Sequence, residues 1–144
     1  LPAGHLLLKM RKRLRGAPNE EISGLLQNQT FLVREDGSGT RILLERFLDT
    51  IGKGREFNRK EFSSNETIKQ GVMAGLGIAL ISASTVVNEI KDGSLETLNL
   101  QNLPIMRQWF LVNPIESTQN PSVDMFKKFL FKHKIELIPK YRND

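Results

Sequence analysis

The residues best suited to chemistry in this chain are small, carry hydroxyl groups and lie between glycines. Gly37-Ser38-Gly39-Thr40 follows a short apolar run and precedes apolar residues at helical spacing, so we expect a turn that opens a helix. Glycine permits positive φ and close approach of a ligand, and the first N–H groups of a helix attract carboxylate or phosphate. With Arg41 adding positive charge, Ser38, Gly39 and Thr40 predict a binding site for a small anionic metabolite. A plain helix start is the alternative.

A second helix start strengthens this prediction. The run Ser63-Ser64-Asn65-Glu66 contains a capping box, with Ser63 followed three residues later by Glu66. In a parallel sheet both turns lie beyond the carboxyl ends of their strands, where ligands usually bind. We therefore expect two positive helix ends to face one crevice, although the capping box also has a purely structural interpretation.

Residues for catalysis are scarce in this sequence. It contains no Cys and only two His, near the two ends of the chain, so we predict no thiolate nucleophile, no metal site and no cofactor. Gly37-Ser38-Gly39 lacks the Gly-x-Ser-x-Gly frame of a hydrolase and the Gly-Lys-Ser/Thr ending of a P-loop. The carboxylates Glu35, Asp36, Glu61 and Glu66 have no spacing that would pair them, so we expect no enzyme.

Composition is that of one globular domain. The 144 residues are 39% hydrophobic and 26% charged, which predicts a single α/β domain over residues 1–144. The lack of Cys favours a reducing compartment, so we expect a cytoplasmic protein, and the short apolar runs and absent signal peptide predict no membrane partner. The net charge of +5 is concentrated in Lys9–Arg15 and Lys127–Lys134, interpreted as solvated surface rather than a nucleic-acid site.

The elements that must position the candidate residues alternate between strand and helix patterns. Strands are expected at 31–34, 57–62, 78–81 (buried and parallel), 95–100 (an edge) and 107–113 around Trp109; helices are expected at 40–51, 63–76, 84–90 and from 121 onward. This alternation predicts stacked βαβ units, with a mainly parallel sheet and flanking helices.

Four segments together resemble a known family. Arg34-Glu35-Asp36-Gly37-Ser38-Gly39-Thr40-Arg41, Ser64-Asn65-Glu66-Thr67-Ile68-Lys69-Gln70, Ala74-Gly75-Leu76-Gly77-Ile78-Ala79 and Pro104-Ile105-Met106-Arg107-Gln108-Trp109 resemble, in order and spacing, the effector domain of LysR-type transcriptional regulators. The likeness is greatest to the branch that controls carbon-fixation genes, the RuBisCO operon regulators. In that branch the first segment usually has proline where this chain has Asp36, which places a negative charge beside the predicted anion site.

The resemblance implies a type II periplasmic-binding-protein fold, of which this chain holds the second subdomain and the C-terminal helix. It also implies that Ser38, Gly39 and Thr40 line an effector crevice that Asn65 and Glu66 help to close, and that Trp109 lies on a crossing strand near the hinge. By the same resemblance the whole protein is a homo-oligomer, a dimer or tetramer, in which the helices at 40–51 and 84–90 meet a second subunit. DNA would be bound only through an N-terminal domain that the chain lacks. A free-standing solute-binding protein of the same fold is the alternative, and an enzyme of that fold is a third hypothesis.

Overall fold

The computed structural model describes residues 1–112 and 120–137 of the chain. These residues divide between two compact units, Leu1–Pro104 and Ile105–Asp144, which are described separately. The candidate residues all lie in the first unit.

Two parallel strands form the centre of the first unit. Strand β1, Thr30–Arg34, pairs with β2, Asn58–Phe62, in a register that sets Thr30 opposite Asn58 and Arg34 opposite Phe62. On its other edge β1 makes one parallel bridge, in which Leu32 N–H donates to the Ile78 carbonyl (2.8 Å) and Ile78 N–H donates to the Thr30 carbonyl (2.9 Å). The parallel arrangement predicted from the alternating patterns is therefore confirmed.

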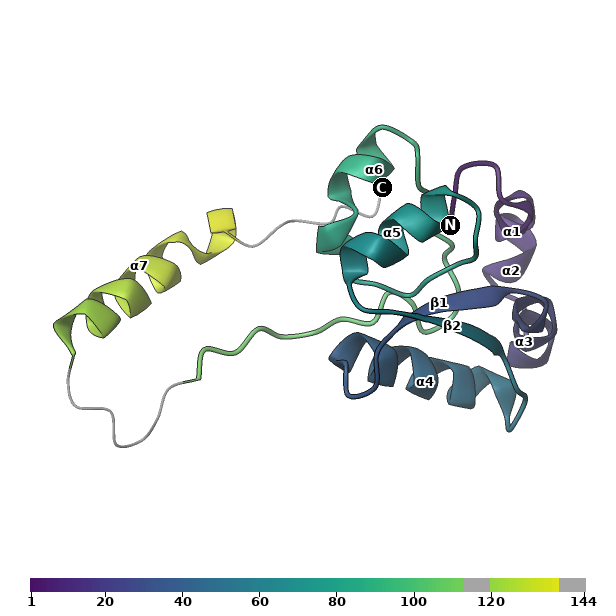
Figure 1. Ribbon diagram of the computed structural model, residues 1–144, viewed down its shortest axis with the longest axis horizontal. Coiled ribbons are helices and arrows are strands. Elements are labelled where there is room, and N and C mark those ends of the chain that lie inside the picture. Colours follow the sequence, from purple (N-terminus) through teal and green to yellow (C-terminus); the bar gives the residue numbers. More distant parts are fainter. Residues whose placement is uncertain (113–119, 138–144) are drawn as a thin grey trace. The chain divides into compact units, whose positions relative to one another are not determined.

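Helices cover both faces of β1, because neighbouring side chains of a strand point to opposite faces. Phe31 and Val33 pack in the core cluster that contains α4, Gly39–Gly52, whereas Leu32 packs in the cluster that contains α5, Asn65–Met73. Figure 1 shows α4 and α5 on the two sides of the strand pair. Both helices were predicted from their apolar spacing, and their buried stripes face β1 as expected.

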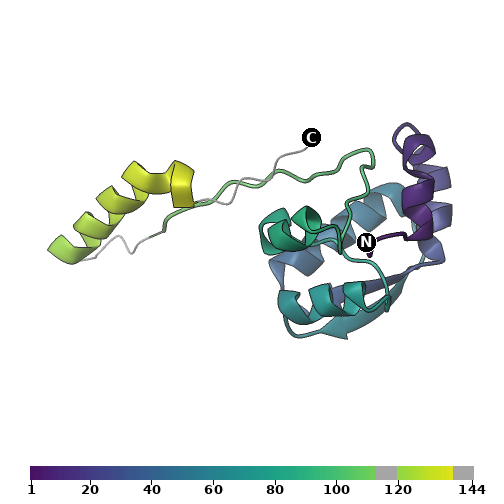
Figure 2. The ribbon, with the colours of Figure 1, turned by 90° about the horizontal axis from the view of Figure 1, so that it is seen from above.

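Shorter helices surround this centre. They are α1 (Leu6–Lys9), α2 (Arg11–Leu14), α3 (Asn19–Gln27), the 3-10 helix η1 (Ala83–Thr85) and α6 (Val87–Lys91). Helix α3 packs against α4. In Figure 2, which is turned by 90° from Figure 1, α1 and α2 (purple) lie on a different side of the unit from α5 and α6 (teal). The sequence has two signals for α3, a proline directly before it and Glu20 and Glu21 in its first turn.

Gly77 permits the close approach of the segment after α5 to β1. A Cβ atom added at Gly77 would lie 2.3 Å from the Thr30 carbonyl oxygen, well inside van der Waals contact. Glycine is therefore required where the chain returns beside the strand.

Two predicted strands of the first unit are wrong as regular strands. Residues 78–81 contribute the single bridge at Ile78, and residues 95–100 contribute a single antiparallel bridge between Leu95 and Pro2. Both segments are nevertheless partly buried, with Ile78, Leu95 and Leu100 in the core. Burial explains their apolar pattern, so no sheet is needed to account for it.

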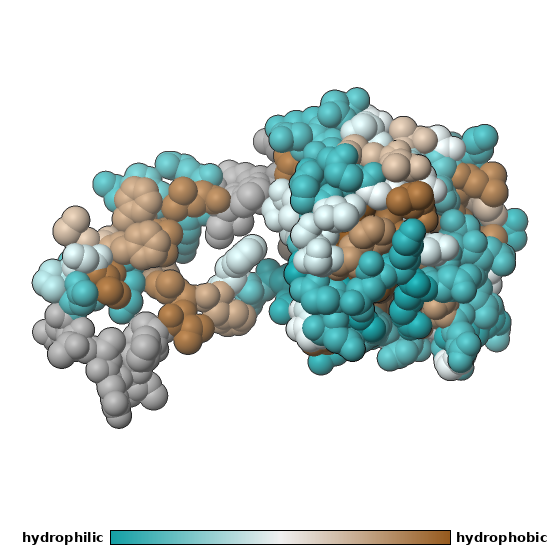
Figure 3. Space-filling view, in the orientation of Figure 1, coloured by the Kyte–Doolittle hydropathy of each residue, from teal (hydrophilic) through white to brown (hydrophobic). Residues whose placement is uncertain are grey.

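The second unit holds helix α7, Pro121–Leu137, whose start at Pro121 was predicted. The strand predicted at 107–113 is wrong for residues 107–112, which form neither strand nor helix; Asn113 lies outside the described residues. Trp109 is 80% exposed and so is not a core residue. Figure 3 shows hydrophobic side chains gathered in this unit, and the exposed ones include Met106, Trp109, Phe110, Val112 and Met125. Within residues 1–112 and 120–137 no helix combines the length and apolarity needed to span a membrane.

Candidate functional site

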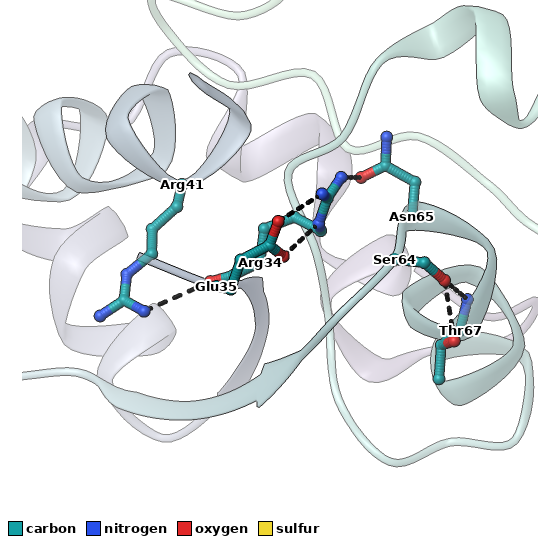
Figure 4. A network of polar contacts seen from close by, with 6 residues as sticks. All are labelled: Arg34, Glu35, Arg41, Ser64, Asn65 and Thr67. Carbon is teal, nitrogen blue, oxygen red and sulfur yellow. Dashed lines mark hydrogen bonds and ion pairs between the residues drawn. The ribbon is translucent and has the colours of Figure 1, made fainter. Parts of the chain in front are cut away.

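Both predicted helix starts lie at the same end of the strand pair, beyond the carboxyl ends of the strands, which we call the carboxyl edge. Strands β1 and β2 are parallel and end opposite each other at Arg34 and Phe62, and α4 and α5 begin a few residues after these ends. The edge thus has the geometry at which α/β proteins usually bind ligands. The close-up in Figure 4 shows the polar side chains at this edge.

Arg34, the last residue of β1, connects the two helix starts. Its guanidinium Nη1 donates to Oδ1 of Asn65, the first residue of α5, over 3.2 Å. Its backbone carbonyl accepts a hydrogen bond of 3.3 Å from Nη1 of Arg41 on α4. One residue therefore contacts both helices, and in Figure 4 the Arg34 side chain extends toward Asn65 while Arg41 lies on the opposite side of it.

The start of α5 is capped one residue later than the sequence pattern predicted. Ser64 is the N-cap residue, and its hydroxyl accepts from the Thr67 N–H (3.0 Å) and contacts the Thr67 hydroxyl (2.9 Å). The capping box assigned to Ser63 and Glu66 is therefore wrong. Glu66 instead forms an ion pair with Lys69 (2.8 Å) and accepts a hydrogen bond from Gln70 (3.0 Å). These side-chain contacts within α5 stabilise its first turns.

The start of α4 has no side-chain cap. Ser38 occupies the N-cap position, but its hydroxyl makes no capping hydrogen bond. Within the described part of the chain, the N–H groups of Gly39, Thr40 and Arg41 have no hydrogen-bond acceptor. A Cβ at Gly39 would meet nothing within 4 Å, so the space beside this helix end is open. These amides are free to bind an acceptor from outside the chain.

Acidic side chains surround Arg41. Its guanidinium forms ion pairs with Glu61 of β2 (2.7 Å), Glu45 of α4 (2.9 Å) and Asp36 of the preceding turn (3.1 Å). Hydrogen bonds to Glu45 and Glu61 raise the pKa of Arg41 above its ordinary value, against the opposing effect of burial. The positive charge that the sequence placed at this helix start is thus already balanced by three carboxylates.

Among the residues that the structure describes, Arg34 has a single acidic partner. Its Nε and Nη2 donate to the two carboxylate oxygens of Glu35 over 2.7 and 2.6 Å, a bidentate pair. This hydrogen bonding to Arg34 lowers the pKa of Glu35 to about 2. Arg34 is not among the site residues predicted from the sequence, although a cation at the end of a buried strand, shortly before a glycine turn, is a signal that points to it.

In the two described ranges, no three His, Asp or Glu side chains come together in a way that could hold a metal ion.

Comparison with known proteins identifies close relatives. Residues 16–134 match the model of the LysR substrate binding domain. The chain is 46% identical over 112 residues to the HTH-type transcriptional regulator CbbR of Cereibacter sphaeroides, covering 73% of this chain and 36% of that protein. It is 40% identical over 106 residues to the RuBisCO operon transcriptional regulator of Acidithiobacillus ferrooxidans, covering 74% of this chain and 34% of that protein. The chain therefore spans little more than a third of the length of these relatives.

A solved structure has the same fold. The regulatory domain of Synechocystis PCC6803 CcmR, solved in complex with 2-PG, is 29% identical and superimposes with a TM-score of 0.70 over 86% of this chain and 59% of that domain. The predicted α/β fold, and the prediction that this chain holds part of a larger domain, are confirmed by this match.

Proposed function

Because this chain belongs to the LysR substrate-binding domain family, we propose that it is the effector-sensing part of a transcriptional regulator of carbon-fixation genes. The observation that carries the proposal is the meeting of two helix starts and Arg34 at the carboxyl ends of two adjacent parallel strands. The named relatives are transcriptional regulators, which supports a regulator rather than a free-standing solute-binding protein or an enzyme.

The effector in this proposal is a small anion, with 2-phosphoglycolate as the first candidate. Support comes from the bound 2-PG of the CcmR regulatory domain and from the uncapped amides at the start of α4. Ser38, Gly39 and Thr40 would bind the anion through hydroxyl and N–H groups, and Asn65 and Glu66 through the N–H groups that open α5. Arg41 would add a positive charge to the carboxyl edge.

In the whole protein, effector binding would change how a DNA-binding part outside this chain meets its operator. A ligand shifts such an equilibrium only if it binds the two states unequally, so the effector must prefer one arrangement of the protein. We place this regulator in the cytoplasm as a homodimer or homotetramer, with α4 and α6 as candidate contacts between subunits. Support for both statements is the family alone.

Isothermal titration of the full-length gene product with 2-phosphoglycolate tests the proposal. The double variant Ser38→Ala/Thr40→Ala should raise the dissociation constant about tenfold, because each lost hydrogen bond is worth about 0.5 to 1.5 kcal/mol. Stability should hardly change, since the Ser38 hydroxyl caps nothing.

Thr50→Ala is the matched control, because it removes a hydroxyl from the far end of the same helix, where Thr50 donates to the Arg46 carbonyl. It should leave binding unchanged. If no anionic metabolite binds the full-length protein, or if the double variant binds as tightly as the wild type, the proposed site is wrong.

A further inference from the structure

Each of the three nitrogens of the Arg34 guanidinium donates a hydrogen bond to a group of the chain itself. Nε and Nη2 bind the two oxygens of Glu35, and Nη1 binds Oδ1 of Asn65. This planar arrangement of two parallel hydrogen bonds is the one that arginine offers to any carboxylate or phosphate group. The Glu35 carboxylate therefore occupies the place that an anionic ligand would take.

The two partners differ in how firmly they are held. Arg34 belongs to strand β1 and its side chain is 22% exposed. Its guanidinium is also hydrogen-bonded to Asn65 of α5. The Glu35 side chain is 43% exposed and lies in the turn after β1, where the chain has no regular structure. Arg34 is thus the fixed member of the pair, and Glu35 is the member that can move into solvent.

Arg34 is also the easier of the two arginines for an external anion to reach. Within the described ranges, an anion at Arg41 would compete with Asp36, Glu45 and Glu61, whereas an anion at Arg34 would compete with Glu35 alone. When the ligand's anionic group replaces the Glu35 carboxylate at Arg34, the guanidinium is paired with an anion both before and after the exchange. The displaced Glu35 carboxylate is then hydrated. The Glu35 side chain is 43% exposed, so water can solvate its carboxylate after the ligand has replaced it, and the exchange is feasible.

From this geometry we propose that Arg34 is the residue that binds the anionic group of the ligand and that Glu35 is an internal competitor, which occupies Arg34 until the ligand displaces it. The inference rests on the proposed function and adds to it the cation that recognises the ligand and the group that opposes binding.

Titration of four full-length variants with 2-phosphoglycolate and with inorganic phosphate tests the inference. Glu35→Gln removes the competing charge and should lower the dissociation constant about fivefold or more, because a bidentate pair lies at or above the upper end of the range for exposed ion pairs. Arg34→Gln should raise it about tenfold or more, because charge-assisted bidentate bonds are lost. Arg34→Lys keeps the charge without the bidentate geometry and should fall between wild type and Arg34→Gln. The double variant Arg34→Gln/Glu35→Gln should bind no more tightly than Arg34→Gln alone. Circular dichroism checks that each variant is folded.

Two further variants separate the local effect from a general change in charge. Glu56→Gln removes an exposed carboxylate outside the site and should leave binding unchanged, while Glu61→Gln frees one partner of Arg41. If Glu61→Gln tightens binding and Glu35→Gln does not, Arg41 is the anion-binding residue and the inference is overturned.

The outcomes also distinguish this inference from the proposed function. If the wild type binds the ligand, and Glu35→Gln changes the dissociation constant no more than Glu56→Gln does, the inference is overturned and the proposed function stands. If neither the wild type nor Glu35→Gln binds, both are overturned.

Discussion

At the scale of single residues, the ionisation of Glu35 determines the pH range in which its pair with Arg34 exists. The pKa of Glu35 is lowered from 4.5 to about 2 by its hydrogen bonds to Arg34. Because the folded pKa lies below the unfolded one, the pair contributes stability above pH 4.5, and this contribution is lost as the pH falls toward 2.

We therefore expect the difference in melting temperature between wild type and Glu35→Gln to be constant from about pH 5 to 8 and to shrink as the pH falls from 4.5 toward 2. Thermal unfolding followed by circular dichroism across this range measures the difference. A difference that persists unchanged at the acidic end, or that disappears near neutrality, would mean that Arg34 does not hold the Glu35 carboxylate.

The backbone at Gly77 leaves no room for a side chain. Replacement by Ala places a Cβ 2.3 Å from the Thr30 carbonyl oxygen, so the segment after α5 must move away from β1. Overpacking of this kind costs about 1 to 3 kcal/mol, and we expect a loss of at least that size in the free energy of unfolding by urea. Gly16→Ala, whose added Cβ meets nothing within 4 Å, is the control and should unfold at the wild-type urea concentration.

At the scale of elements, the position of the α5 cap can be tested directly. Ser64→Ala removes the hydroxyl that accepts from Thr67 N–H and should lower stability by about 1 kcal/mol. Ser63→Ala should have little effect, because Ser63 is not the N-cap residue of α5. Equal losses from the two variants, measured by urea unfolding, would contradict the assignment of Ser64 as the cap.

The elements that sequence patterns predicted well are those stabilised by local interactions. The apolar spacing of α4 and α5 specifies a helix and its buried face within one segment, and the structure has both. Residues 78–81 are a continuous apolar run and residues 95–100 alternate in part between apolar and polar, yet a strand also requires a partner elsewhere in the chain, which spacing within the segment does not reveal. Pattern alone therefore identified burial correctly and pairing incorrectly.

The candidate site shows the same division. The two helix starts at the carboxyl edge followed from the order of strands and helices, so their shared location was predictable. That Arg34 reaches Asn65, 31 residues further along the chain, depends on side-chain positions and was not. The pair of Arg41 with Glu45 follows the i,i+4 spacing of a helix, which the sequence shows, whereas Asp36 and Glu61 come from the preceding turn and from β2, and no spacing rule joins them to Arg41.

The second unit exposes many apolar side chains, including Trp109 and Phe110. The chain covers 59% of the CcmR regulatory domain, so a longer protein of this family contains further structure that could cover these residues. Trp109 is the one Trp of the sequence, so the Trp fluorescence of this chain reports on the surroundings of that residue alone.

We expect the fluorescence of Trp109 to differ between this chain and a version extended to a complete LysR substrate-binding domain. In the extended protein its emission should shift to shorter wavelength and become less accessible to iodide quenching, because burial removes the indole from water. Any further Trp in the extension is replaced by Phe so that the signal stays with Trp109. Identical spectra and quenching in the two proteins would show that residues 105–112 remain exposed.

The bidentate contact between Arg34 and Glu35 has a consequence for selectivity among the common anions of a cell. Chloride and acetate are plentiful, but each offers a single charge and must dislodge a carboxylate that is covalently tethered one residue away. A phosphate ester offers up to two charges and more acceptor oxygens, so it has an advantage over this tethered rival that simple salts lack. A sensor built in this way would ignore the background electrolyte and respond to metabolites of higher charge.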